Sequence, residues 1–457
     1  MTTSFRYRHK HLTLCLAVCS LCLSTGCATI RAARDIQKGK NPPPGERLLQ
    51  AGEVGLSSNT VLTLESALQI PLTYHPQIVQ AQQALAAATA RVYQARAAYW
   101  PQIGGSAGAS LSTANSQGQP GSHSTHNSFS GSVGLDLLVY DFGKTPAIVR
   151  QVYAGLIAAT ENLRATRSDV AFTTRIAYFN LGKAIELERV AIDDVRQNQI
   201  HLDQVKAFLD VGRRTRYDLT KSEVDLGNSK LNLIKAGNDV STARATLNRS
   251  LGLAEDPGYQ LRPNLSEVFP LSPADRLMAH ARQIHPGLKS LQAQERAASA
   301  SVDEAIANLY PDLGLQAKYG LTGSRFPLIW NWSAGLQSSL QLFTGGRQVW
   351  RINEVVTQLR SARAKTVERE QMIYEDIQTT LSQLDSSQQR LALTDLITRQ
   401  ALESLNLISE RYRLGAASAV DVTDAQVAVT GARAEQVKAK FDYQAAIAQI
   451  KHACGEE

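Results

Sequence analysis

Cysteine is scarce in this sequence of 457 residues, and most of it lies at the N-terminus. Only Cys454 stands apart from the four cysteines of the N-terminal segment, which are Cys15, Cys19, Cys22 and Cys27. A mature chain with so little cysteine cannot build a disulfide framework or a cysteine-ligated metal site. His123 and His126 share a Ser-rich stretch, but two histidines without further ligands are usually surface residues. We therefore expect no metal and no cofactor.

Long hydrophobic runs are also missing, with one exception. Residues 12–23 form an apolar run of about twelve residues, which follows a basic stretch that includes Arg6 and Lys10. A membrane-spanning helix needs about 20 apolar residues, so this run is too short to be one. Its length and its basic flank are typical of a signal peptide, which we place at residues 1–26.

The end of this signal segment allows two kinds of processing. Gly26-Cys27 resembles a bacterial lipoprotein cleavage site, at which the new N-terminal cysteine is acylated, so Cys27 is a candidate lipidation site. The aliphatic residue that is usual three positions before such a cysteine is replaced here by Ser24. Ordinary cleavage between small residues is the alternative.

Neither the charge nor the motifs favour nucleic acid binding or catalysis. The 48 basic and 41 acidic residues give a net charge of +7, but no basic run is interleaved with aromatic residues. Nucleic acid is therefore not a predicted partner. A phosphate-binding loop and a nucleophile elbow are both absent, so the sequence does not predict an enzyme.

The chain contains a tandem duplication, which fixes its organisation. Residues 98–104 return as residues 308–314, a shift of 210. Further along, Val211-Gly212 returns as Leu414-Gly415, a shift of 203 that holds for over a hundred residues. The predicted organisation is a signal peptide at 1–26, an N-terminal linker or anchor at 27–60, a first repeat at 61–256, a linker at 257–269 and a second repeat at 270–457.

Proline is absent from two long stretches, which allows very long helices there. None occurs between Pro146 and Pro257, and none follows Arg347. Apolar residues recur at heptad steps in both stretches, which is coiled-coil periodicity. Residues 144–211 would form a helix of roughly 100 Å, too long for a globular domain. Flanking helices near 65–98 and 218–251 would together match its length.

Each repeat also predicts a β-hairpin in a segment rich in glycine and serine. The expected strands are 103–114 with 128–140, and 313–322 with 329–343. Apolar and small or polar residues alternate there, as in transmembrane β-strands, although a flexible linker is the alternative reading of residues 104–131. Three aromatic residues near the second loop suit an interfacial girdle or, alternatively, one buried cluster: Phe326, Trp330 and Trp332.

Four strands per chain cannot close a barrel. An open strand edge in lipid would leave backbone donors and acceptors without partners, at several kcal/mol each. Copies of the chain must therefore share one barrel. Eight strands leave little lumen, whereas twelve strands from three chains allow a passage.

Across residues 60–455 the sequence resembles the TolC-like outer membrane efflux protein family. The resemblance rests on the duplication, on residues 63–68 followed by His75-Pro76, on residues 140–144, and on the two Val/Leu-Gly turns. It implies a mainly helical homotrimer with a twelve-stranded outer-membrane barrel continued by a twelve-helix periplasmic tunnel. It also implies a channel that contacts outer-membrane lipid, a periplasmic adaptor and an inner-membrane pump, and that has no catalytic chemistry.

The resemblance also assigns roles to the two turns between long helices, which form the periplasmic tip in that family. The residues expected to contact the adaptor are Gly212, Arg213, Thr215, Gly415, Ala416 and Ser418. Asp421 and Asp424 match two aspartates that project into the lumen, where a trimer would stack two acidic rings that attract cations. Three residues apart, they share one helix face. The alternative is that both only begin the helix, where acidic residues suit its dipole.

The family's closed tip is latched by a tyrosine, an aspartate and an arginine. Tyr412 and Asp218 match the first two positions, but Ala417 stands at the position of the arginine. Three arginines of the first turn are candidates to replace it: Arg213, Arg214 and Arg216. An extended coiled-coil periplasmic scaffold without a pore is the alternative function, but it leaves the signal peptide and the repeated hairpins unexplained.

Overall fold

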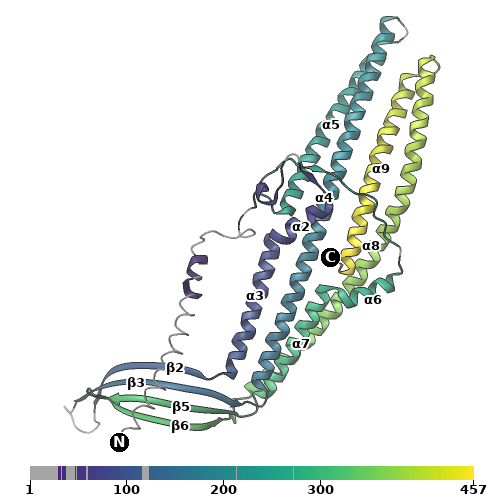
Figure 1. Ribbon diagram of the computed structural model, residues 1–457. Helices are drawn as coiled ribbons and strands as arrows, with labels where there is room; N and C mark the ends of the chain where they lie inside the picture. The colour runs from purple at the N-terminus through teal and green to yellow at the C-terminus, as the bar shows by residue number, and fades with distance from the viewer. Residues whose placement is uncertain are drawn as a thin grey trace.

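The computed structural model describes residues 29–31, 33–37, 47, 49–57, 60–115, 123–212, 214–270 and 272–456. Figure 1 shows a long, narrow molecule with a β-sheet at one end and the turns of two helical hairpins at the other. Two short helices and a small two-stranded sheet lie between these ends, at a level that we call the equator.

Two very long helices run through the molecule. They are α4 (Lys144–Asp210) and α8 (Arg347–Arg413), each of 67 residues. Each begins after a glycine with a positive φ, +95° at Gly143 and +83° at Gly346. At about 1.5 Å per residue each is roughly 100 Å long, so the predicted rod-like helices are confirmed.

Shorter helices complete each repeat. Towards the tip, α5 (Arg216–Leu251) and α9 (Ala419–Cys454) return alongside the long helices. Towards the sheet, α3 (Pro76–Arg96) and α7 (Pro286–Ala307) do the same. The equator holds α2 (Leu64–Tyr74) and α6 (Ala274–Ile284).

The predicted single helix near 65–98 is wrong, because the chain breaks between α2 and α3. His75 has an extended backbone, with φ −66° and ψ 132°, and its imidazole accepts a hydrogen bond from the amide of Gln77. Pro76 then takes the first helical position, where its missing N–H costs nothing. His285-Pro286 separates α6 from α7 with a similar extended backbone, and the His285 imidazole accepts from the amide of Leu288.

The helix bounds reproduce the two sequence registers. Helices α8 and α9 begin and end 203 residues after α4 and α5, while α6 begins and ends 210 residues after α2, and α7 begins 210 after α3. The tandem duplication is thereby confirmed as a duplication of structure. The residue limits of the two repeats stay a prediction.

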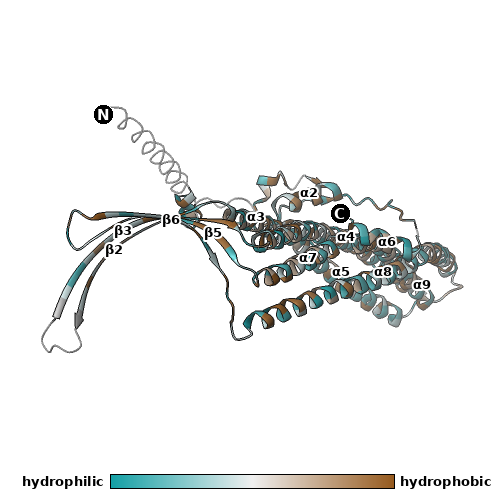
Figure 2. Cartoon of the chain, turned by 90° about the horizontal axis from the view of Figure 1, so that it is seen from below, coloured by the Kyte–Doolittle hydropathy of each residue, from teal (hydrophilic) through white to brown (hydrophobic). Residues whose placement is uncertain are grey.

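The sheet contains four antiparallel strands in the order β2-β3-β5-β6. Their bounds are β2 (Gln102–Asn115), β3 (His123–Tyr140), β5 (Asp312–Gly323) and β6 (Ile329–Ser339). The flexible-linker reading of the first hairpin is therefore wrong for the described residues. Strand β6 ends four residues before the expected position 343, and the Phe343 side chain beyond it is 88% exposed. Figures 1 and 2 show the sheet curving with two open edges, β2 and β6.

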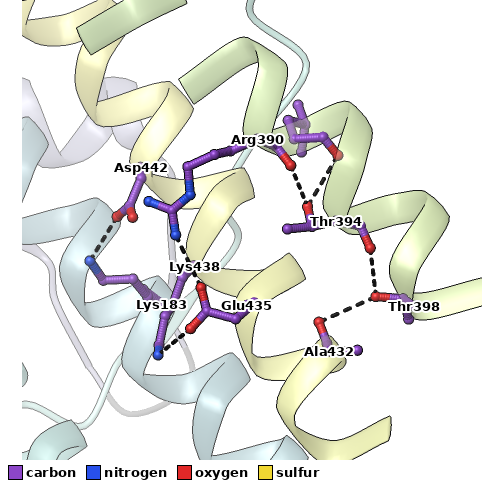
Figure 3. Close-up of polar contacts among 9 residues, drawn as sticks. Lys183, Arg390, Thr394, Thr398, Ala432, Glu435, Lys438 and Asp442 are labelled. Atoms are coloured by element: carbon purple, nitrogen blue, oxygen red, sulfur yellow. Dashed lines mark hydrogen bonds and ion pairs between the residues drawn. The ribbon is translucent and has the colours of Figure 1, made fainter. Parts of the chain in front are cut away.

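The helices form a second open layer, which continues the sheet. Near the strands the neighbours are α3, α4, α7 and α8, in that order; near the tip they are α5, α4, α9 and α8. Helix α4 thus lies inside the layer, whereas α8 forms one edge and α3 with α5 forms the other. Figure 3 shows α9 held on both sides, by Lys183 of α4 bonding Asp442 and by Arg390 of α8 bonding Glu435, each at 3.0 Å.

The main hydrophobic cores lie at the equator. Strand β1 (Val61–Leu62) pairs in parallel with β4 (Gln260–Leu261) over a cluster that includes the buried residues Leu62, Tyr178 and Leu251. The Tyr178 hydroxyl donates to the Leu62 carbonyl at 3.0 Å. Full burial of such side chains contributes about 1.5–3 kcal/mol each, so the equator anchors helices that have little core elsewhere.

Among the described residues, no helix is long and apolar enough to cross a membrane. Figure 2 shows hydrophilic and hydrophobic residues mixed along the helices rather than separated into long apolar stretches.

Candidate functional site at the helical tip

The tip consists of two short turns, one in each repeat. Gly212 follows α4 with φ +73°, and Gly415 follows α8 with φ +79°. Glycine reaches this left-handed backbone without the strain that a side chain would add. The Gly212 amide donates to the Leu209 carbonyl at 2.9 Å, and the Gly415 amide donates to the Tyr412 carbonyl at 3.0 Å.

The two returning helices begin with matching capping boxes. The amide and the hydroxyl of Thr215 both donate to Asp218, and the Asp218 amide donates back to the Thr215 hydroxyl. Ser418 and Asp421 make the same three bonds. Such boxes satisfy amides that a helix start leaves free. The bonds from Thr215 and Ser418 lower the pKa values of the Asp218 and Asp421 carboxyls.

Asp421 and Asp424 are both exposed in the single chain. Asp421 has the helix-start role that the sequence offered as one alternative. Asp424 lies in the second turn of α9 and has no hydrogen bond or ion pair among the described residues. The predicted pair of acidic rings needs further copies of the chain and stays a prediction.

Tyr412 is the buried centre of the tip, with only 4% of its surface exposed. It packs with Ala419 and Val422, and its ring lies 6.1 Å from that of Phe208 and 5.7 Å from that of His201. Burial raises the pKa of the Tyr412 hydroxyl. This hydroxyl has no hydrogen-bond partner among the described residues, so it is not bonded to Asp218.

Arg214 joins the two turns. Its guanidinium lies over the Tyr412 ring, 4.2 Å from the ring centroid, and donates to the Ala417 carbonyl at 3.4 Å. A cation over an aromatic face contributes about 0.5–2 kcal/mol, with the larger values at buried sites. Of the three arginines considered from the sequence, Arg216 is exposed and Arg213 lies outside the described residues.

A cavity of about 390 Å³ lies behind this contact, between α4 and the second hairpin. Its walls include His201, Tyr412 and Gln426, and the buried Gln426 amide nitrogen also lacks a hydrogen-bond partner among the described residues. A polar cavity of this size can hold water, which would satisfy both groups. Burial lowers the pKa of His201. Sequence reasoning missed His201 and Gln426, because single polar residues in a heptad pattern carry no signal of their own.

The other residues singled out from the sequence lie away from the tip. His126 is exposed on β3, opposite Ser112, and no group of His, Cys, Asp or Glu in the described part of the chain could hold a metal. Phe326, Trp330 and Trp332 are all more than half exposed, so the buried-cluster alternative is wrong. Cys27 lies outside the described residues.

Comparisons with known proteins agree on one family. The family model described as "Outer membrane efflux protein" matches residues 67–253 and 277–456. The outer membrane efflux protein BepC of Brucella suis is 25% identical over 415 residues, which are 88% of this chain and 88% of BepC. The outer membrane protein TolC of Escherichia coli is 21% identical over 88% of this chain and 85% of its own.

A solved structure shares the fold. The outer membrane protein VceC of Vibrio cholerae superposes with a TM-score of 0.76 at 19% identity, covering 86% of this chain and 96% of VceC. At that identity the likeness shows the architecture alone.

Proposed function

Because the chain belongs to the outer membrane efflux protein family, we propose that it is the outer-membrane channel of a tripartite efflux or type I secretion system. In this role it passes substrates from an inner-membrane pump and a periplasmic adaptor to the exterior, without catalysis and without a cofactor. The sheet contacts the lipid of the outer membrane, and the helices extend into the periplasm.

The observation that carries this proposal is the missing junction between repeats. Inside one chain the first repeat joins the second through strands β3 and β5, and through α4 against α7 and α9. The same junction, carried over by the duplication, would join β6 to β2 and α8 to α3 and α5. Within the described chain those edges stay open. Copies that repeat one head-to-tail contact form a closed ring when the rotation between neighbours completes a full turn.

Closure into a ring is what makes the molecule a channel. Strand edges in lipid need partners, so the ring must close within the membrane. Three copies give twelve strands, enough for a lumen, and the helical layers of the three copies then continue that lumen.

The experiment is chemical crosslinking of the purified protein in detergent extracts of outer membranes. We expect a limit of three chains, together with channel conductance in planar bilayers. A monomer with intact secondary structure would contradict the proposal. A soluble, elongated dimer without conductance would instead favour the pore-free scaffold.

At the tip, we propose that Tyr412 and Arg214 form the latch of the closed channel, with Asp218 beside it. The contact of Arg214 with Tyr412 and Ala417 supports this role, because it ties the first turn to the second. The turn residues Gly212, Arg213, Thr215, Gly415, Ala416 and Ser418 then contact the adaptor. Asp421 and Asp424 form the acidic constriction.

We also propose that Cys27 is acylated after removal of residues 1–26. Mass spectrometry of the mature N-terminus tests this point. An N-terminal Cys27 that carries acyl chains is the expected result, and an unmodified terminus elsewhere would remove the proposal without affecting the channel.

A further inference from the structure

The C-terminal end of α9 is covered by α4 of the same chain. Asp169 of α4 lies 2.9 Å from Nε2 of His452, and the Phe172 ring stacks on the imidazole with centroids 4.4 Å apart. Directly before Asp169, the Ser168 hydroxyl donates to the Glu456 carbonyl at 3.3 Å. Residues 168–172 of α4 therefore form one contact patch for the end of α9.

The equivalent end of α5 is uncovered. A shift of 203 carries His452 back to Arg249, in the last turn of α5. Beside Arg249 lies a hollow of about 770 Å³, whose other walls include His75, Thr173, Gly252 and Leu253. Arg249 is exposed and makes no ion pair with any described residue. We call this hollow the equatorial socket.

The helix equivalent to α4 is α8, and it carries a matching patch. The same shift takes Ser168, Asp169 and Phe172 to Gln371, Met372 and Glu375. All three are exposed at the open edge of the helical layer, with Met372 44% exposed. Glu375 has no side-chain partner among the described residues, although its position corresponds to the ring that stacks on His452.

We propose that the equatorial socket binds α8 of a second copy of this chain, with Glu375 of the second copy paired to Arg249. The inference rests on the ring proposed above and names the residues that hold it together. Two opposite charges, each without a partner in one chain, occupy positions that touch at the covered site. In the covered site the equivalent positions are occupied by the stacked rings of Phe172 and His452. Between copies, an ion pair would take the place of that ring contact.

A second pair of positions supports the same alignment of helices. Thr430 of α9 donates to Asp194 of α4 at 2.8 Å. The equivalent positions are Gly227 of α5, which has open space where a side chain would project, and Ile397 of α8, which is 43% exposed. An isoleucine of one copy can therefore pack over the glycine of the next. Gly227 and Ile397 lie 22 residues tipward of Arg249 and Glu375, so one antiparallel register satisfies both contacts.

Cysteine crosslinking tests the register directly. The double variant Arg249→Cys, Glu375→Cys should be joined between copies by a short bismaleimide, giving covalent dimers and trimers in a denaturing gel. The bismaleimide is chosen because two long charged side chains hold their Cα atoms farther apart than the roughly 4.4–6.8 Å that a direct disulfide allows. Each single variant should give neither product, because it has only one of the two thiols. Cys454 is buried and is present in every variant, which controls for background.

Charge reversal tests the ion pair itself. Arg249→Glu and Glu375→Arg should each lower the temperature at which the oligomer dissociates, and the double reversal should restore most of the loss. Lys235→Glu is the matched control, since Lys235 is exposed on the same helix and its equivalent, Lys438, bonds to Glu435 within α9. It should leave the dissociation temperature unchanged.

The two proposals fail separately in these experiments. An intact wild-type oligomer in which the cysteine pair does not crosslink, or in which the double reversal is no better than the single ones, would overturn the socket. A wild-type protein that forms no oligomer would overturn the ring.

Discussion

The two long hairpins have the same length and the same capped turns, but they are attached differently. Helix α9 is bonded to α4 through Lys183–Asp442 and to α8 through Arg390–Glu435 (Figure 3). Between the described residues of α4 and α5, one side-chain hydrogen bond is present, from Thr174 to the Ser250 carbonyl at 3.5 Å, and no ion pair. One sequence pattern thus serves as an interior helix in one repeat and as an edge helix in the other.

The two repeats therefore use equivalent helices differently. The interior helix, α9, makes its side-chain contacts within one chain, so its partners are visible in the structure. The edge helix, α5, has charged and small residues without partners in the described chain, and these are available to a neighbouring chain. Changes that break an α9 contact should therefore act on the fold of the chain, while changes on α5 should act on assembly.

The largest effect is expected where the Phe441 ring of α9 packs against Gly182 of α4. A Cβ atom added to Gly182 would lie 2.7 Å from Cε1 of the buried Phe441 ring. Gly182→Leu should therefore destabilise the protein by at least about 3 kcal/mol, the upper end of the usual cost of overpacking. Thermal unfolding followed by circular dichroism measures this loss.

The matched control is Gly155→Leu on the same helix, where an added Cβ meets nothing within 4 Å. Its melting temperature should stay within a few degrees of the wild type. Equal losses in the two variants would show that the helix rejects leucine in general, and that the α9 contact is not the cause.

The next effect concerns the contact that joins the two hairpins. Arg214→Ala removes the cation over Tyr412 and the bond to the Ala417 carbonyl. We expect single-channel conductance at low voltage to rise several-fold, because the removed contacts together contribute about 1–3 kcal/mol to the closed tip.

Arg216→Ala, which removes an exposed arginine of the same turn, should leave the conductance unchanged. If both variants conduct alike, net charge at the tip governs the current and Arg214 is not the latch.

A smaller effect is expected from the acidic residues that distinguish the second turn. Asp424 corresponds to Lys221 in the first repeat, so only α9 begins with two carboxylates on one face. The double variant Asp421→Ala, Asp424→Ala should keep its assembly and lose several-fold in affinity for a blocking divalent or trivalent cation. Planar-bilayer titration with the cation measures this change.

Asp218→Ala removes the matching capping residue from the other hairpin and should leave the cation block intact. If cations block the Asp421/Asp424 variant as strongly as the wild type, the two residues serve only the start of the helix.

The smallest effect is expected from the polar contacts of Figure 3. Glu435 accepts bonds from Arg390 at 3.0 Å and Lys438 at 2.8 Å, but all three side chains are partly exposed. Glu435→Ala should cost no more than about 1 kcal/mol, as is usual for solvent-accessible ion pairs. Urea denaturation measures this loss in the free energy of unfolding, and Asn232→Ala, the equivalent change on α5, is the control. An equal loss in both variants would show that the two hairpins do not differ at this position.

Much of the architecture could be predicted because it depends on repeated, local patterns. Gly212 and Gly415 marked the turns, and the heptads gave α4 to within one residue of its end. The break at His75 was missed because one helix near 65–98 gives the length needed to match the long helix, although Pro76 signals a helix boundary. Strand β6 was placed too long because Leu342 and Phe343 continue its apolar character beyond its last hydrogen bonds.

The tip was harder to predict, since its contacts join residues about 200 positions apart. Arg214 was one of three candidates, and only the folded chain shows its guanidinium over Tyr412. His201 and Gln426 were not singled out, because the neighbours that bury them come from the other hairpin.

The strands of the two hairpins differ in length, and this unevenness sets the outline of the outer rim. Phe129 of β3 lies opposite Gly323, the last residue of β5, so residues 123–128 extend past the strands of the second hairpin. Six extended residues rise by about 20 Å. In a closed ring of copies, long and short hairpins would alternate around the outer rim. A molecule that binds the rim from outside would therefore contact one protruding hairpin per chain, whereas the helical tube has two similar helical hairpins per chain.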